Sequence, residues 1–129
     1  MNFLIFDDSP SAVIDVQLKV HSILPDAQIH RALNYDTASD ILKNHSIDLA
    51  FIDLSMPDKN GMDFISDFIQ PHPEYNQMPI IVITAVKPDS ILSAALDGTV
   101  SSYLVKPVST LELEVSIKHA LKTKLESIG

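Results

Sequence analysis

A chain of 129 residues, 46% hydrophobic and 20% charged, has the length and composition of one soluble globular domain and is too short for two domains of ordinary size. Its formal net charge of −8 argues against unaided binding to nucleic acid or to an anionic membrane surface, because both attract basic patches. The lack of cysteine excludes disulfides and thiolate metal sites, and the lack of a signal peptide or a long apolar stretch predicts a cytoplasmic protein.

Short apolar runs alternate along the chain with segments of helical period. The predicted strands span residues 3–7, 27–33, 48–53, 79–84 and 101–105. Strands that are apolar at nearly every position are usually buried on both faces, as in a parallel sheet covered by helices. The strict alternation therefore predicts an α/β fold with a doubly wound parallel sheet of five βα units.

The predicted helices follow the strands in order. The first carries Ala12, Val16, Val20 and Ile23 at helical spacing and ends before Pro25. The second spans residues 36–44, the third begins near Gly61 and stops before the loop 71–79, and the fourth covers 90–96. A capping box at Ser109 and Glu112 starts the fifth, which runs to about Ser127. Either Asp8 or Ser9 caps the first helix, with Pro10 at its first position.

Polar residues stand where the predicted strands end. Asp7 and Asp8 follow the first strand, Asp53 ends the third, Thr84 ends the fourth, and Lys106 follows the fifth. Ligands of doubly wound sheets bind outside the carboxyl ends of the strands. Three carboxylates and one ammonium suit a hard divalent cation, and Mg²⁺ favours phosphate oxygens as its remaining ligands. A carboxylate beside a cation and an ammonium can attack a phosphoryl group and form an acyl phosphate.

Each of these residues also has an ordinary structural interpretation. Asp53 can be an ordinary strand-end acid, one of Asp7 and Asp8 can be a helix cap, and Thr84 can be a β-branched strand residue. Lys106 can be a solvated charge. Tyr103, three residues earlier, can be a half-buried strand aromatic.

The order of these motifs resembles bacterial two-component response-regulator receiver domains, the chemotaxis regulators included. The motifs are Asp7-Asp8, Asp53 followed by Leu-Ser-Met-Pro-Asp-Lys-Asn-Gly-Met-Asp, Thr84-Ala85 and Lys106-Pro107. The resemblance covers essentially the whole chain and implies a single receiver domain over residues 1–129. It further implies a flavodoxin-like sheet of strand order 2-1-3-4-5 and a cis peptide between Lys106 and Pro107.

The same resemblance implies roles for the residues at the strand ends. Asp53 is the expected phosphoacceptor, and Asp7 and Asp8 are the expected acidic pair that holds Mg²⁺ together with Asp53. Ser55 is expected to offer its backbone carbonyl to the metal ion. Met56, Pro57 and Gly61 match the family's loop after the acceptor strand.

Three further residues are expected to respond to phosphorylation. Thr84 is expected to hydrogen-bond a phosphoryl oxygen, Lys106 to pair with the phosphoryl group, and Tyr103 to serve as the switch aromatic. Val86 offers no polar group to orient a water, which favours a longer-lived phosphoryl state. The face formed by the fourth helix, fifth strand and fifth helix is then expected to change shape and to be sensed by partners.

The resemblance also implies partners. The phosphoryl donor is expected to be a sensor histidine kinase or a histidine phosphotransfer protein, and the output a downstream protein target or a fused output domain. The chain is either a stand-alone regulator or a receiver excised from a longer protein. No direct contact with nucleic acid or membrane is expected. Apolar positions on the fourth and fifth helices form either a dimer face or part of the core: Leu92, Leu96, Leu113 and Ile117.

Three other functions stay open at this point. A magnesium-dependent phosphohydrolase that uses an aspartyl phosphate predicts an acid two residues past the nucleophile, where Ser55 stands. A receiver-like interaction module that is never phosphorylated predicts loss of some acidic or lysine positions, and all are present. A flavin carrier of the same fold predicts a neutral or basic first loop, but that loop is acidic. The favoured hypothesis is a signalling switch that catalyses its own phosphorylation and dephosphorylation, and not a conventional enzyme.

Overall fold

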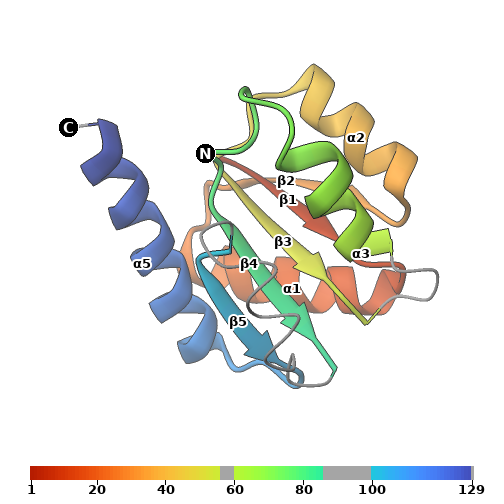
Figure 1. The fold of residues 1–129 in the computed structure, drawn as a ribbon. Coiled ribbons are helices and arrows are strands. Elements are labelled where there is room, and N and C mark those ends of the chain that lie inside the picture. The colour runs from red at the N-terminus through yellow and green to blue at the C-terminus, as the bar shows by residue number, and fades with distance from the viewer. Residues whose placement is uncertain (56–59, 86–99, 129) are drawn as a thin grey trace.

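A five-stranded parallel sheet forms the centre of the molecule (Figure 1). The computed structural model describes residues 1–55, 60–85 and 100–128. The strands are β1 (Asn2–Phe6), β2 (Gln28–Ala32), β3 (Leu49–Asp53), β4 (Ile80–Thr84) and β5 (Ser102–Val105). They lie in the order β2-β1-β3-β4-β5, and every pair is parallel. This order confirms the predicted flavodoxin-like α/β fold.

Helices cover both faces of the sheet (Figure 1). They are α1 (Pro10–Ile23), α2 (Tyr35–Asn44), α3 (Asn60–Asp63), which continues as a π-helix η2 (Phe64–Ile69), and α5 (Thr110–Ile128). The predicted fourth helix over residues 90–96, with Leu92 and Leu96, lies outside the described residues, as do Met56, Pro57 and Val86. Within the described ranges, no helix is both long and apolar enough to cross a membrane.

Two hydrophobic cores hold the layers together. On one face, Phe3, Ile5 and Phe51 pack against α1 and α5. On the other face, Leu4, Phe6 and Ile52 pack against α2 and η2. All five positions of β3 and of β4 are buried, which explains why these strands read as continuous apolar runs.

The edge strand β2 has a different character. Gln28 and Arg31 are exposed, Ile29 and His30 are half-buried, and only Ala32 is fully enclosed. Because β2 pairs with β1 alone, its other edge has no neighbouring strand in the described sheet. Polar side chains are therefore tolerated along β2, whereas β3 and β4 carry them only at their last residues, Asp53 and Thr84.

Local hydrogen bonds fix where the helices begin. Ser9 caps α1: its Oγ accepts from the backbone N–H of Ala12 at 3.4 Å, and Pro10 follows at the first helical position. This identifies Ser9, and not Asp8, as the cap. At α5 the predicted capping box is confirmed, because Glu112 N donates to Ser109 Oγ at 3.1 Å and Ser109 Oγ donates to Glu112 Oε1 at 3.1 Å.

Two apolar positions on α5 are core residues. Leu113 and Ile117, considered for a dimer face, are 0% and 1% exposed and pack toward the sheet beside Val16 and Val20 of α1. The dimer interpretation is wrong for these two side chains, because the face of α5 that carries them is already covered. The outward side of α5 instead exposes Leu111 and Val115.

Candidate functional site

The carboxyl ends of the central strands bring the predicted site residues to one rim of the sheet. Asp7 directly follows β1, Asp53 ends β3, Thr84 ends β4, and Lys106 directly follows β5. The strand order places β1 beside β3, β3 beside β4 and β4 beside β5. Residues that are up to 99 positions apart in the chain therefore meet, as shown by the bond between Lys106 and Asp7.

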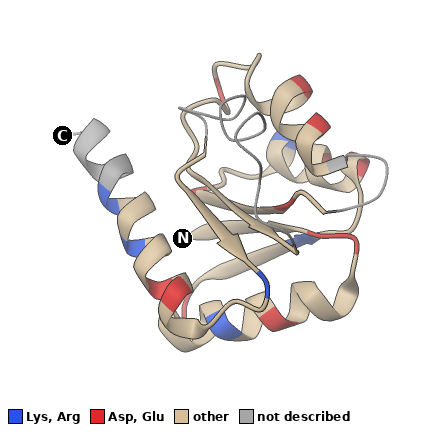
Figure 2. Cartoon of the chain, turned by 60° about the horizontal axis from the view of Figure 1, so that its bottom comes forward, with Lys and Arg blue, Asp and Glu red and all other residues tan. Residues whose placement is uncertain are grey.

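Three carboxylates gather at this rim. One oxygen each from Asp7, Asp8 and Asp53 lies within 4.8 Å of the others. Asp7 and Asp53 are each 5% exposed, whereas Asp8 is exposed to solvent in the loop that leads to α1, where Figure 2 shows acidic positions. Carboxylate oxygens are the ligands that Mg²⁺ and Ca²⁺ prefer, and an exposed third acid leaves an open approach. The donor set fits a hard divalent cation.

Lys106 supplies positive charge to the two buried acids. Its Nζ lies 2.9 Å from Asp7 Oδ2 and 3.3 Å from Asp53 Oδ2. Partial burial lowers the pKa of Lys106, but the hydrogen bond and charge of Asp7 and the charge of Asp53 outweigh this effect and raise it overall. The ammonium therefore remains charged while it bridges the ends of β1 and β3.

Asp7 is held in an environment that opposes its ionisation. Burial raises the pKa of Asp7, and this effect exceeds the opposing hydrogen bonds from Lys106 Nζ and from the backbone N–H of Ser9, which lies 3.0 Å from Asp7 Oδ1. The negative charge of Asp53 adds to the rise. A cation at this site would offset both the cost of burying the Asp7 charge and the repulsion between Asp7 and Asp53.

Ser55 connects Asp53 to the end of β4. Asp53 Oδ1 accepts from Ser55 N at 2.8 Å and from Ser55 Oγ at 2.6 Å. Ser55 Oγ in turn accepts from Ala85 N at 3.2 Å. The family resemblance implied a role for the backbone carbonyl of Ser55, and the sequence reasoning missed this use of its side chain. A hydroxyl two residues after a strand-end acid is a local hydrogen-bonding signal that could have indicated the first of these bonds.

The predicted response residues lie on the neighbouring strands. Thr84 is 2% exposed, and its backbone carbonyl accepts from Lys106 N at 2.8 Å. Tyr103 pairs with Val82 in the sheet register and is half-buried against the core that faces α2 and η2. The end of β4 is thus tied both to Ser55 and to the segment that carries Lys106. The expected cis peptide between Lys106 and Pro107 is confirmed.

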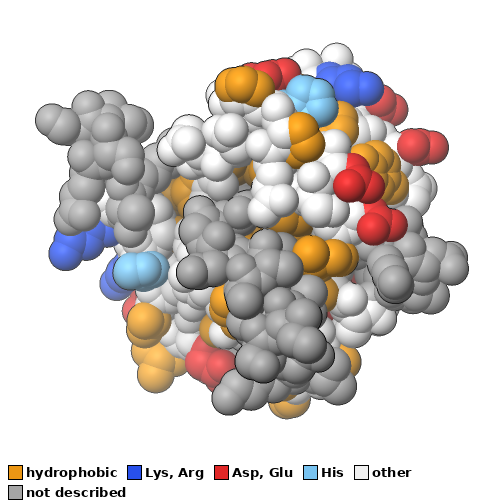
Figure 3. Space-filling view, viewed as in Figure 1, with side chains coloured by type: hydrophobic (Ala, Val, Ile, Leu, Met, Phe, Trp, Pro, Cys, Tyr) orange, Lys and Arg blue, Asp and Glu red, His pale blue; other side chains and the backbone are white. Residues whose placement is uncertain are grey.

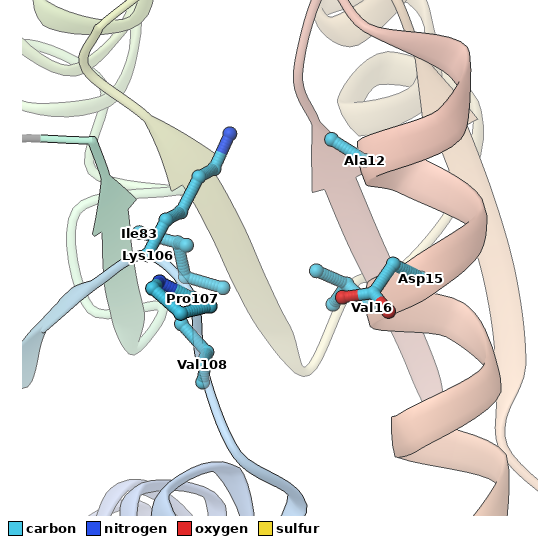
Figure 4. A pocket seen from close by; sticks show the side chains of 7 residues that line it. All are labelled: Ala12, Asp15, Val16, Ile83, Lys106, Pro107 and Val108. Carbon is cyan, nitrogen blue, oxygen red and sulfur yellow. The ribbon is translucent and has the colours of Figure 1, made fainter.

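A mostly apolar pocket of about 350 Å³ lies beneath Lys106 (Figure 4). It is lined by Ala12, Asp15, Val16, Ile83, Lys106, Pro107 and Val108, and the Lys106 side chain extends away from Pro107 and Val108. Lys19 Nζ lies 2.8 Å from Asp15 Oδ2 and donates to Val108 O at 2.6 Å. These bonds fix α1 to the segment after β5 at one side of the site.

Curated relatives of this chain are regulators. It is 28% identical to the cyclic di-GMP phosphodiesterase response regulator RpfG of Xanthomonas campestris pv. campestris over 127 residues, which cover 98% of this chain and 33% of that protein. It is 34% identical to the transcriptional regulatory protein CitT of Bacillus subtilis over 98 residues, 75% of this chain and 42% of that protein. The chain thus spans less than half the length of each of these two relatives.

Solved structures share the fold. The chemotaxis protein CheY4 of Vibrio cholerae superposes with a TM-score of 0.79 at 21% identity, covering 92% of this chain and 97% of that chain. The N-terminal domain of a response regulator/sensory box/GGDEF 3-domain protein from Carboxydothermus hydrogenoformans gives 0.82 at 16% identity, with both chains fully covered at 100%.

The response regulator receiver domain, as a family, matches residues 3–118. This match includes β1 from Phe3 onward, the other four strands and every residue of the rim described above. The chain therefore belongs to the response regulator receiver domain family.

Proposed function

We propose that this chain is a phosphoacceptor receiver of a two-component system and that Asp53 accepts a phosphoryl group from a phosphohistidine of a sensor kinase or phosphotransfer protein. The observation that carries this proposal is the surroundings of Asp53. Its carboxylate is buried at the end of β3, its Oδ2 faces Lys106, and the carboxylates of Asp7 and Asp8 lie beside it. Membership of the receiver family supports the same role.

The chemistry is a transfer of one phosphoryl group. A carboxylate oxygen of Asp53 forms a bond to phosphorus, the bond from phosphorus to the donor nitrogen breaks, and the imidazole leaves with that electron pair. Lys106, already cationic, neutralises charge on the phosphoryl oxygens, and Asp7 and Asp8 hold Mg²⁺ with Asp53 and the Ser55 carbonyl. When bound, Mg²⁺ supplies charge neutralisation and orientation of the phosphoryl oxygens.

The output is a change in the strand ends after Asp53 is modified. Phosphorylation adds about −1.5 to −2 charge and new acceptor oxygens, toward which Thr84 and Lys106 are expected to move. Tyr103 lies on the strand that leads to Lys106, so it is the proposed reporter of that movement to a downstream partner or a fused output domain. The site offers no carboxylate at position 55, which disfavours the phosphohydrolase alternative. The cytoplasm is the proposed compartment.

Asp53→Asn provides the first test. The protein is incubated with acetyl phosphate and Mg²⁺, and its intact mass is measured beside Asp53→Asn and beside Asp26→Asn, which changes an exposed acid in the loop between α1 and β2. We expect the parent and Asp26→Asn to gain one phosphoryl group and Asp53→Asn to gain none. A parent that stays unmodified while Mg²⁺ binding is confirmed would instead identify a receiver-like interaction module that works without phosphorylation.

A further inference from the structure

The Ser55 hydroxyl forms a chain of hydrogen bonds between two strand ends. Its single proton is donated to Asp53 Oδ1 at 2.6 Å, and its oxygen accepts the backbone N–H of Ala85 at 3.2 Å. Ser55 and Ala85 are 30 positions apart in the chain. The side chain of Ser55 therefore joins the loop after β3 to the residue that follows β4, in addition to the β3–β4 ladder itself.

The charge on Asp53 strengthens this chain. A distance of 2.6 Å is typical of a hydroxyl that donates to an ionised carboxylate, which is a stronger bond than one between neutral groups. Donation to the carboxylate polarises the hydroxyl and makes its oxygen a better acceptor for the Ala85 N–H. Both bonds are therefore strongest while Asp53 carries its negative charge in the carboxylate.

Phosphorylation of Asp53 would remove that condition. An acyl phosphate has no carboxylate charge on Oδ1, and the negative charge lies on the phosphoryl oxygens. The bond from the Ser55 hydroxyl to Oδ1 then loses its charge assistance, and the phosphoryl oxygens become stronger acceptors for the Ala85 N–H than a serine hydroxyl. The arrangement seen around Ser55 is thus suited to the unmodified acceptor.

We propose that Ser55 is a positioning residue specific to the unphosphorylated state: its hydroxyl holds the Ala85 amide at the end of β4 to the unmodified Asp53, and phosphorylation of Asp53 releases it. This inference rests on the proposed phosphoacceptor function. Its regulatory consequence is that the Ser55 hydroxyl opposes the movement at the end of β4 that accompanies phosphorylation. Loss of the hydroxyl therefore makes the phosphorylated arrangement easier to reach.

Three variants separate this role from a general effect on the fold. Ser55→Ala removes the hydroxyl, and Ser55→Thr retains it. Ser39→Ala is the control for loss of a serine hydroxyl outside the rim, because Ser39 lies on α2 and its hydroxyl also donates a hydrogen bond, to Asp36 O at 2.9 Å. Ser39 is buried, whereas Ser55 is exposed. The chemical shift and hydrogen exchange of the Ala85 amide are measured by NMR without any phosphoryl donor. The rate constant for phosphoryl uptake from acetyl phosphate with Mg²⁺ is measured by intact mass.

Ser55→Ala is expected to shift the Ala85 amide resonance, to accelerate its exchange and to raise the uptake rate constant about fivefold, the factor for losing one hydrogen bond of about 1 kcal/mol. Ser55→Thr, which keeps the hydroxyl, should restore the Ala85 amide shift and exchange, and Ser39→Ala should resemble the parent in all three measurements. An unchanged Ala85 amide in Ser55→Ala overturns the proposed link, and a changed amide with an unchanged or slower uptake overturns its opposition to phosphorylation. Failure of the parent itself to take up a phosphoryl group overturns the proposed function. If the parent is modified normally, either of the two contrary results for Ser55→Ala overturns only the role proposed for Ser55.

Discussion

Lys106 carries one positive charge for three neighbouring carboxylates. Its Nζ contacts Asp7 and Asp53, both buried, but Asp8 stands exposed at the outer side of the cluster. The charge imbalance therefore falls on a side chain that solvent or a cation can reach. Asp8 contributes little to the buried hydrogen bonds of the rim, so its replacement separates cation binding from the stability of the fold.

Asp8→Asn is predicted to reduce the stabilisation by Mg²⁺. A ligand that binds only the folded state stabilises it by about 2.7 kcal/mol at 100 times its Kd, so added Mg²⁺ should raise the Tm of the parent by several degrees. The variant should have a Tm close to that of the parent without Mg²⁺ and a clearly smaller rise with it. Thermal melts of the parent, Asp8→Asn and the loop control Asp26→Asn check this, and equal rises in all three would contradict a role for Asp8.

At the scale of single elements, the π-helix η2 brings aromatic side chains together. Gln70 N donates to Ile65 O at 2.9 Å, a bond that spans five residues and not four. Phe64 meets Phe6 of β1 edge-on, with 5.3 Å between ring centroids, and stacks on Phe68 at the same centroid distance. Phe68 stacks in turn on Tyr75 at 5.2 Å.

In Figure 3 acidic side chains lie on the same side of the molecule as α2 and α3.

Phe64→Ala is predicted to be strongly destabilising. Phe64 is 0% exposed and packs between β1 and Tyr35 of α2, so its truncation leaves a cavity and should lower the free energy of unfolding by about 3–5 kcal/mol. Phe68 is only half-buried, so Phe68→Ala should cost markedly less. Urea denaturation of both variants measures the difference. A smaller loss in the free energy of unfolding for Phe64→Ala than for Phe68→Ala would contradict this account of how the two rings pack.

A histidine pair joins β2 to the end of α2. The rings of His30 and His45 have centroids 4.3 Å apart, and His30 Nε2 lies 3.1 Å from Asn2 Oδ1. Burial lowers the pKa of His30 from its ordinary value of 6.5, and the charge of His45 lowers it further. The folded state therefore binds this proton less tightly than the unfolded chain does. The contribution of neutral His30 to stability is fully present above pH 6.5 and is lost as the pH falls through the pKa of His30 in the folded state.

His30→Gln is predicted to flatten this pH dependence. The Tm of the parent should fall between about pH 7 and pH 5, because the unfolded chain takes up a proton at His30 before the folded protein does. Glutamine does not titrate, so the variant should lose less Tm over the same interval. Thermal melts at several pH values provide the comparison, and parallel curves for parent and variant would show that His30 contributes nothing.

At the scale of the whole molecule, the features set by repeated patterns could be predicted from the sequence. Continuous apolar strands such as β3 and β4 report burial on both faces, and parallel strands with alternating helices leave their carboxyl ends on one rim. The meeting of Asp7, Asp53 and Lys106 at that rim follows from the topology alone. The roles of these residues in phosphoryl transfer stay predictions, since only geometry and family membership support them.

Other features depend on choices that a pattern does not contain. The π-helix η2 has residues that suit an ordinary α-helix equally well, so its wider turn was not foreseen. The periodicity of α5 shows that Leu113 and Ile117 share a face but not that this face meets the sheet and α1. A serine hydroxyl can find hydrogen-bond partners close to it in the chain, so the sequence does not reveal a partner on another strand. The bond from Ala85 N to the Ser55 hydroxyl forms because β3 and β4 are paired.

The polar character of β2 has a consequence for concentrated solutions. An open strand edge offers unpaired backbone groups to a second copy of the same chain, and such pairing is a common route to aggregation. Arg31 is exposed on β2, so two β2 edges that approach each other would bring like charges near one another. The least enclosed strand of the sheet thus discourages growth of the sheet from one molecule into the next.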